Sequence, residues 1–188
     1  MGWLIYGAGD HAKVVIELLE GIEEKIDYMF DDSFEGGLYE GHPTGHYTEG
    51  LFPMSNLIIA IANNNDRKRI AEKMKDYNPT SLFHPSSVVS PRADIGDGTL
   101  VLANAVVQVG AKLGRFCLIN IGAMVDHGAV IGDFVQIAPR AFVASGAEIG
   151  EGALIGAGAV INQHVKVPAW TVVPAGTVLT VKEDDKAQ

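Results

Sequence analysis

The most regular feature of the sequence is an aliphatic residue at every sixth position between residues 89 and 179. The repeat runs through sixteen positions without a gap: Val89, Ile95, Val101, Val107, Leu113, Ile119, Val125, Ile131, Ile137, Val143, Ile149, Ile155, Ile161, Val167, Val173 and Leu179. Neither the helix period of 3.6 nor the strand period of 2 generates a strict six. The repeat therefore indicates a structural unit that stacks on copies of itself.

A small side chain follows four residues after nearly every aliphatic one. These small residues are Ala93, Thr99, Ala105, Ala111, Cys117, Ala123, Ala129, Ala141, Ala147, Ala153 and Ala159, with Val135 and Val165 as larger exceptions. Three hexads make one triangular coil of a parallel β-helix, in which the aliphatic residue fills the interior and the small residue leaves room near the corner. We expect about five coils, with residues eighteen apart stacked over one another and no loop inserted between coils.

The residues ahead of the repeat predict a small α/β unit. We expect strands at 2–6, 25–30, 57–62 and 80–83, helices at 12–19 and 66–77, and a glycine-rich loop at 35–50. Strands that alternate with helices favour a parallel sheet. The expected domains are residues 1–84 and residues 85–181, followed by a polar tail at 182–188.

Composition narrows the possible function classes. The net charge of −9 argues against a nucleic-acid binder, because phosphate contacts need clustered Lys and Arg. The single cysteine, Cys117, excludes an internal disulfide and falls on an inward position, so we expect a small buried side chain. No apolar run reaches membrane length and residues 1–4 lead straight into a glycine turn, so we expect no membrane span and a cytoplasmic location.

A glycine turn with the pattern G-x-G-x-x-A occupies residues 7–12, between the first strand and the first helix. Backbone N–H groups at such a helix start can hold a diphosphate, although a tight turn also needs glycine for steric reasons alone. The acidic pair after the second strand strengthens the ligand interpretation, because a nucleotide's ribose or base would be read there. The candidate substrate-binding residues are Gly7, Gly9, Asp10, His11, Asp31, Asp32 and Asn63.

His127 is the histidine best placed for catalysis, at the third position of a hexad and so near a corner of the coil. A lone exposed histidine is more often structural, and the residues alone leave both readings open. His11 either touches phosphate or caps the helix. His42 and His46 lie in a loop without further ligands, so we expect no metal site.

The order of these segments resembles the PglD/NeuD-type sugar acetyltransferases of the hexapeptide-repeat superfamily. The matching segments are residues 5–15 (IYGAGDHAKVV), the pair Asp31-Asp32, the pair His84-Pro85, residues 119–127 (INIGAMVDH) and residues 131–133 (IGD). They cover essentially the whole chain. The resemblance implies a Rossmann-like nucleotide-sugar-binding domain followed by a left-handed β-helix, an exception to the right-handed crossover rule.

The resemblance also implies roles for residues in the coils. The histidine that matches His127 is the general base, which deprotonates the acceptor's amine or hydroxyl as it attacks the acetyl thioester. Many relatives have an acidic residue directly after this histidine, where Gly128 stands here, so Asp126 or an acid from a neighbouring subunit would have to orient the ring. Acetyl-CoA would lie between β-helices of a homotrimer, against Gln136, Gly122, Ser145, Ala157, Gln163 and Ala175.

We therefore expect an acetyl-CoA-dependent acetyltransferase that acts on an amino or hydroxyl group of a sugar, most simply a nucleotide-linked amino-sugar. Two departures leave a second hypothesis open, a scaffold protein with weak or no activity: Gly128 follows the histidine, and Gln136 stands where relatives often have a second histidine. A third hypothesis, an NAD-binding module, fits the glycine turn. It is disfavoured because the N-terminal unit is too short for a full dinucleotide domain.

Overall fold

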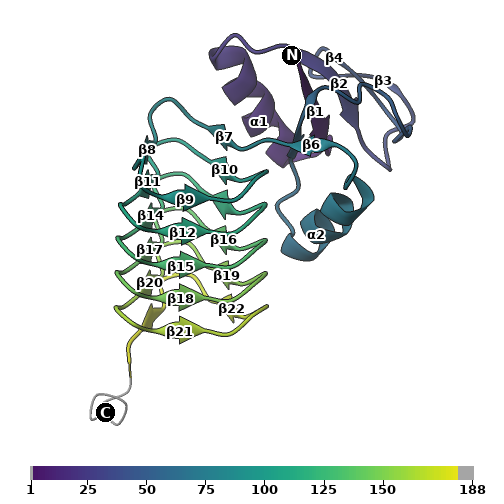
Figure 1. The fold of residues 1–188 in the computed structure, drawn as a ribbon. Coiled ribbons are helices and arrows are strands. Elements are labelled where there is room, and N and C mark those ends of the chain that lie inside the picture. Colours follow the sequence, from purple (N-terminus) through teal and green to yellow (C-terminus); the bar gives the residue numbers. More distant parts are fainter. Residues whose placement is uncertain (1, 182–188) are drawn as a thin grey trace. The chain divides into compact units, whose positions relative to one another are not determined.

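The computed structural model describes residues 2–181 and divides into two compact units, one up to Thr80 and one from Ser81 onward (Figure 1). The boundary expected from the sequence lies four residues later, after residue 84. The predicted polar tail, residues 182–188, lies outside the described residues. Within the described part of the chain, no helix is long and apolar enough to cross a membrane.

The first unit is a six-stranded sheet with two helices. In sheet order its strands are β3 (Gly37–Tyr39), β4 (His42–Gly45), β2 (Ile26–Phe30), β1 (Trp3–Tyr6), β5 (Asn56–Ile59) and β6 (Asn78–Pro79). The helices are α1 (Asp10–Gly21) and α2 (Asn64–Lys73). β1 pairs in parallel with both β2 and β5 and is buried along its whole length. The carboxyl ends of these three strands therefore meet at one edge of the sheet.

Two expectations for this unit are wrong. The region 35–50, predicted as a loop, contains the antiparallel hairpin β3–β4, whose turn residues Glu40 and Gly41 both have positive φ. Its strands are too short and glycine-rich to show a clear alternation. The strand predicted at 80–83 is β7 (Leu82–Phe83), which pairs with a strand of the second unit, while β6 pairs with β5.

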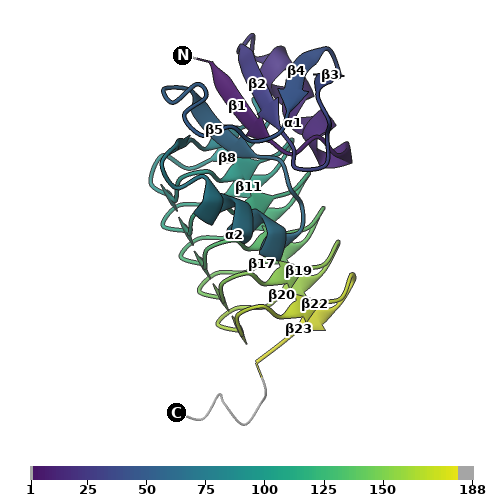
Figure 2. The same cartoon turned by 90° about the vertical axis from the view of Figure 1, so that its right-hand side faces the viewer.

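The second unit is a parallel β-helix, as the hexads predicted, made of three sheets (Figure 2). Sheet 1 contains β7, β10 (Leu100–Val101), β13 (Leu118–Ile119), β16 (Gln136–Ile137), β19 (Leu154–Ile155) and β22 (Val172–Val173). Sheet 2 contains β8 (Val88–Val89), β11 (Val106–Val107), β14 (Met124–Val125), β17 (Phe142–Val143), β20 (Val160–Ile161) and β23 (Val178–Leu179). Sheet 3 contains β9 (Asp94–Ile95), β12 (Lys112–Leu113), β15 (Val130–Ile131), β18 (Glu148–Ile149) and β21 (Lys166–Val167).

The eighteen-residue register fixes the interior. Val107 pairs with Val125 and Val125 with Val143, so each inward side chain lies over its counterpart in the next coil. The aliphatic positions from Val101 to Val173 are at most 4% exposed, and the alanines four residues after an aliphatic position, from Ala105 to Ala159, are fully buried. Cys117 is buried among them, as expected. The repeat begins one hexad earlier than the aliphatic residues suggest, because Phe83 holds the position paired with Val101.

The outward faces of the sheets differ in polarity. Sheet 3 presents the charged residues Asp94, Lys112, Glu148 and Lys166, and Glu148 Oε1 lies 3.0 Å from Lys166 Nζ. Sheet 2 presents only apolar side chains, namely Val88, Val106, Met124, Phe142, Val160 and Val178. This all-apolar face is called the sheet 2 face below. Sheet 1 is also mainly apolar on its outward side, with Leu82, Leu100, Leu118, Gln136, Leu154 and Val172, so the charged side chains distinguish sheet 3 from the other two sheets. An exposed apolar face is typical of a protein contact surface.

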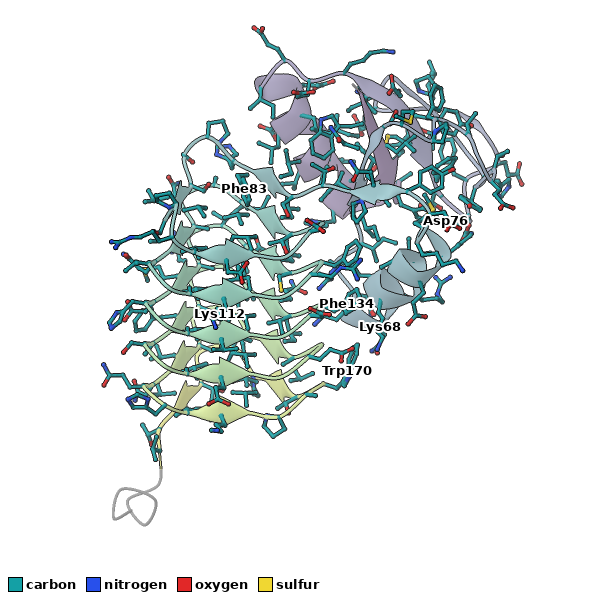
Figure 3. All side chains as sticks on the ribbon, in the orientation of Figure 1. Lys68, Asp76, Phe83, Lys112, Phe134 and Trp170 are labelled. Carbon is teal, nitrogen blue, oxygen red and sulfur yellow. The ribbon has the colours of Figure 1, made fainter. Side chains whose placement is uncertain are left out.

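One corner of the coil carries aromatic side chains. Phe116 and Phe134 stack with ring centroids 5.4 Å apart and planes at 3°. Phe134 and Trp170 lie along the same edge of the coils in Figure 3. Gly152 sits one coil from Trp170, and a Cβ there would collide with the indole ring, so a glycine is required at that position.

We predict that Ile131→Ala lowers the free energy of unfolding by about 2–5 kcal/mol, because it empties a fully packed interior position. The matched control is Val130→Ala in the same strand, whose side chain points outward from sheet 3 and is 44% exposed. Urea denaturation followed by circular dichroism measures both. Equal losses for the two variants would contradict the interior assigned to the hexads.

Candidate active site

His127 lies at the corner between β14 and β15, where its side chain is 64% exposed. The hexad register places it there, because Val125 and Ala129 on either side point inward and are fully buried. Its Nδ1 is 2.9 Å from Oδ1 of Asp126. This contact directs the opposite ring nitrogen, Nε2, away from the carboxylate.

Asp126 is held by more than the imidazole. Its Oδ1 also accepts the backbone N–H of His127 at 2.7 Å, and the backbone N–H of Ser145 in the next coil interacts with the same carboxylate. The N–H of His127 and then the imidazole lower the pKa of Asp126, although partial burial opposes them. The carboxylate is therefore ionised at neutral pH and available to orient the ring.

Gly128 follows the histidine in the left-handed region, with φ +65°. No atom lies within 4 Å of the position that a Cβ would occupy. Other corners hold Asn104, Arg140 and His164 at φ values of 56–60°. The corner at Gly128 therefore has space for a side chain, and Asp and Asn tolerate this backbone conformation best.

Five of the six residues predicted to contact acetyl-CoA lie at two corners of the coil. Ser145 and Gln163 follow His127 at intervals of eighteen, on the corner between sheets 2 and 3. Gly122, Ala157 and Ala175 lie on the corner between sheets 1 and 2, and Gln136 points outward from sheet 1. The two columns run along opposite edges of the sheet 2 face. One subunit therefore does not gather all six residues around a single ligand.

In the first unit, the glycine turn lies at the carboxyl end of β1. Gly7 has φ +115°, and a Cβ there would lie 2.9 Å from the carbonyl oxygen of Ala60. Gly9 is the N-cap of α1, and Asp10 is exposed in its first turn. The first N–H groups of a helix have no partner within the helix, so they can receive an anion.

Asp31 and Asp32 follow β2 beside this turn but have different surroundings. Oδ2 of Asp31 accepts the N–H of Ala8 at 2.7 Å, and its Oδ1 accepts the N–H and hydroxyl of Ser33. These bonds, with Ser33 contributing most, hold the pKa of Asp31 below its usual range against the opposing effect of burial. Asp31 thus ties the end of β2 to the glycine turn, while its role as a ligand contact stays a prediction.

Two further candidates also have internal roles. Asn63 caps α2, because its Oδ1 accepts the N–H of Asp66 at 3.1 Å. Burial and then the charge of Arg67 lower the pKa of His11, so this imidazole is neutral at physiological pH. Both residues follow parallel strands and lie at the edge of the sheet where the glycine turn lies. The described residues contain no group of three His, Cys, Asp or Glu side chains suited to a metal ion.

Three residues near Asp32 were not predicted. The hydroxyl of Tyr6 and Nζ of Lys73 donate to Oδ1 of Asp32 at 2.6 and 2.8 Å, and Lys73 Nζ lies 4.7 Å from the centre of the Tyr47 ring. Lys73 is the last residue of α2, 41 positions from Asp32. A surface lysine on a charged helix gives no sequence signal for such a contact.

Two family models match the chain. One describes the PglD N-terminal domain and matches residues 3–74, and the other describes the bacterial transferase hexapeptide (six repeats) and matches residues 128–163. UDP-N-acetylbacillosamine N-acetyltransferase of Bacillus subtilis (strain 168) is 40% identical over 110 residues. That alignment covers 53% of this chain and 50% of the relative, so the matched stretch is about half of that relative's length.

Solved structures match over nearly the whole chain. A histidine-to-asparagine mutant of perosamine N-acetyltransferase from Caulobacter crescentus, in complex with CoA and GDP-perosamine, is 32% identical with a TM-score of 0.90. The alignment covers 96% of this chain and 89% of that one. The acetyltransferase domain of PglB from Neisseria gonorrhoeae FA1090, in complex with acetyl coenzyme A, is 34% identical with a TM-score of 0.87 and coverages of 95% and 90%.

Proposed function

Because this chain belongs to the PglD-type acetyl-CoA-dependent sugar acetyltransferases, we propose that it acetylates the amino group of a nucleotide-linked sugar. The observation that supports this most is the 2.9 Å contact between Asp126 Oδ1 and His127 Nδ1. With Nδ1 held as the donor, Nε2 is the basic nitrogen and is available to an incoming amine. The names of the relatives favour an amino acceptor over a hydroxyl.

The proposed reaction is a direct acyl transfer. The sugar amine attacks the thioester carbonyl, and His127 Nε2 accepts the proton that the nitrogen loses as the C–N bond forms. The tetrahedral intermediate then expels the CoA thiolate, which takes a proton from the imidazolium. The products are the acetylated amino-sugar and CoA. Asp126 stabilises the imidazolium during this sequence through its bond to Nδ1.

We place acetyl-CoA between two copies of the chain in a homotrimer. Five of the predicted contact residues lie on the two edges of the sheet 2 face, so a corner bearing His127 has to meet the opposite corner of a neighbour to assemble them. The apolar sheet 2 face supplies the surface for that contact, and repeated head-to-tail contacts of this kind close into a ring.

The alternatives make different predictions. An inactive scaffold of this family would bind the nucleotide-sugar but release no thiol from acetyl-CoA. The NAD-binding hypothesis is disfavoured because the first unit, residues 1–80, is too short for a full dinucleotide domain. An assay of thiol release with UDP- and GDP-linked amino-sugars distinguishes an enzyme from a scaffold.

We predict that His127→Ala lowers kcat by roughly 10²–10⁴-fold, the usual contribution of a general base. Acetyl-CoA affinity and the melting temperature should change little, because the side chain is exposed and alanine keeps the backbone N–H that donates to Asp126. Steady-state kinetics with the best amino-sugar, together with calorimetry, measures this. Near-full activity of the variant would contradict the assignment of His127 as the general base and would favour the inactive-scaffold hypothesis.

We predict that Asp126→Asn lowers kcat by about 10²-fold, because the imidazole loses the anion that orients it. In the Asp126→Asn background, Gly128→Asp should restore part of the rate by placing a carboxylate on the other side of the ring. Gly128→Asn in the same background is the matched control, because asparagine has the shape of aspartate without its charge. An equal recovery of kcat with asparagine would show that the negative charge is not the cause.

We predict that Met124→Glu on the sheet 2 face dissociates the trimer, because three buried carboxylates would lack partners. Val130→Glu is the control, since it lies in the same coil on sheet 3 and is similarly exposed, 44% against 41%. Sedimentation velocity at micromolar concentration reports the assembly. A monomeric parent protein, or equal behaviour of the two variants, would contradict the proposed interface.

A further inference from the structure

Arg140 is an isolated cation on the β-helix. It is exposed at the corner between sheets 1 and 2, immediately before β17. The outward positions of the two flanking sheets contain no Lys, Arg, Asp or Glu within the described residues. The other stretches of this corner contain none either, namely residues 84–87, 102–105, 120–123, 156–159 and 174–177. Within residues 2–181, Arg140 has no ion pair, so its side chain is available to a partner from outside the chain.

The backbone at Arg140 directs the side chain toward the coil that carries His127. Arg140 has φ +58°, at a position that is glycine in the coils before and after it, Gly122 and Gly158. Its N–H donates to the carbonyl oxygen of Ile121 at 3.0 Å. Its Cγ lies 3.5 Å from the point that a Cβ on Gly122 would occupy. The stem of the arginine therefore lies over Gly122, next to β14.

Arg140 cannot reach His127 of its own subunit. Gly122 and His127 lie beyond opposite ends of β14, and five residues of extended chain span up to about 17 Å. That distance exceeds the length of an arginine side chain. The proposed trimer, in contrast, brings this corner of one copy to the His127 corner of the next.

The symmetry of the proposed trimer decides what the guanidinium meets there. Two corners that run side by side along several coils require parallel coil axes, so a residue and its copies lie at the same height along the threefold axis. Because the stem of Arg140 lies over Gly122, its guanidinium comes to the height of the coil that contains Asp126. A cation from one copy and an anion from the next are thus brought to the same level.

Asp126 is the anion that the His127 corner offers. It is the only acidic residue in the described stretches of that corner, which are residues 90–93, 108–111, 126–129, 144–147 and 162–165. Its side chain is 28% exposed. The carboxylate accepts from the backbone and the imidazole of His127 and interacts with the N–H of Ser145. A carboxylate has about four acceptor positions, so one remains for a guanidinium N–H.

We propose that Arg140 of one subunit pairs with Asp126 of the neighbouring subunit and fixes the carboxylate that orients His127. This inference rests on the proposed homotrimer and on the proposed role of His127 as the base. A guanidinium is always charged and presents its N–H groups in a rigid fork that fits a carboxylate. The pair also supplies the counter-charge that an arginine beside the apolar sheet 2 contact requires. Arg140 is thus a positioning residue, and each active site contains side chains from two subunits.

The first test is a double-mutant cycle with Arg140→Gly, since glycine holds the same position in the adjacent coils. We expect kcat to fall about 10-fold with little change in either KM, because the base loses its orientation while both substrates still bind. Arg140→Lys should recover part of the loss. Lys112→Gln removes a charge from the exposed face of sheet 3 and is the control that keeps the parental kcat.

The Asp126→Asn background identifies the partner of Arg140. There, Arg140→Gly should have no further effect on kcat, because the pair is already broken. A further loss as large as that in the parent protein would overturn the pairing with Asp126. Parental kcat for Arg140→Gly would overturn the inference and leave the proposed acetyl transfer intact.

The second test uses mixed trimers to ask whether the pair joins two subunits. Co-expression of His127→Ala and Arg140→Gly chains with different affinity tags, followed by purification on both tags, isolates trimers that contain both chains. Native mass spectrometry verifies their composition. In each such trimer one interface of the three joins an intact His127 corner to an intact Arg140, so we expect about one third of the parental activity.

The possible failures are distinct. Activity of the mixed trimers no higher than that of the Arg140→Gly trimer, about one tenth of the parental value, would overturn a pair between subunits. A monomeric parent that releases thiol would overturn the inference and the proposed assembly but not the acetyl transfer. A parent that releases no thiol would overturn the proposed function together with this inference.

Discussion

The interior of the triangular coil is the constraint on which the rest of the second unit depends. Each coil has room for one aliphatic side chain per sheet and one small side chain per corner, and the strict six-residue spacing keeps both in register. Since burial of these positions supplies most of the driving force for folding, a one-residue slip would turn every inward side chain toward solvent. The same register decides which residues face outward, and so it sets the position of His127 and the polarity of each face.

The first unit depends on a different contact. Asp31 joins the end of β2 to the glycine turn after β1, so two neighbouring strands share one edge with a defined geometry. At that edge most candidate polar groups are already engaged in bonds within the chain. The first backbone N–H groups of α1 have no partner within the helix, so an anion can bind there. Internal bonding thus leaves few ways for a ligand to bind there.

The features that could be predicted from the sequence are those that follow from the periodic burial of side chains. The hexads identified the β-helix, its inward columns and the exposed corner of His127, because those follow from spacing alone. The β3–β4 hairpin was missed, since its strands hold only three and four residues around glycines. The contact of Lys73 with Asp32 was also missed, because two side chains 41 residues apart meet only through the packing of α2. The sequence offered two candidates for orienting His127, namely Asp126 and an acidic residue of a neighbouring subunit. The 2.9 Å contact between Asp126 and His127 depends on side-chain rotamers, which residue spacing does not encode.

Because the coils stack in register, the distance between successive coils along the axis of the β-helix is constant. Successive strands in a sheet are about 4.8 Å apart, so positions eighteen residues apart are spaced by that amount along the axis. From His127 the same corner continues through Ser145 and Gln163 to Val181, a span of about 14 Å over three coils. An elongated molecule that lies along this corner therefore contacts one new side chain for each coil that it passes. Adding or removing one whole coil of eighteen residues would change the length of this corner without changing the register of the remaining residues.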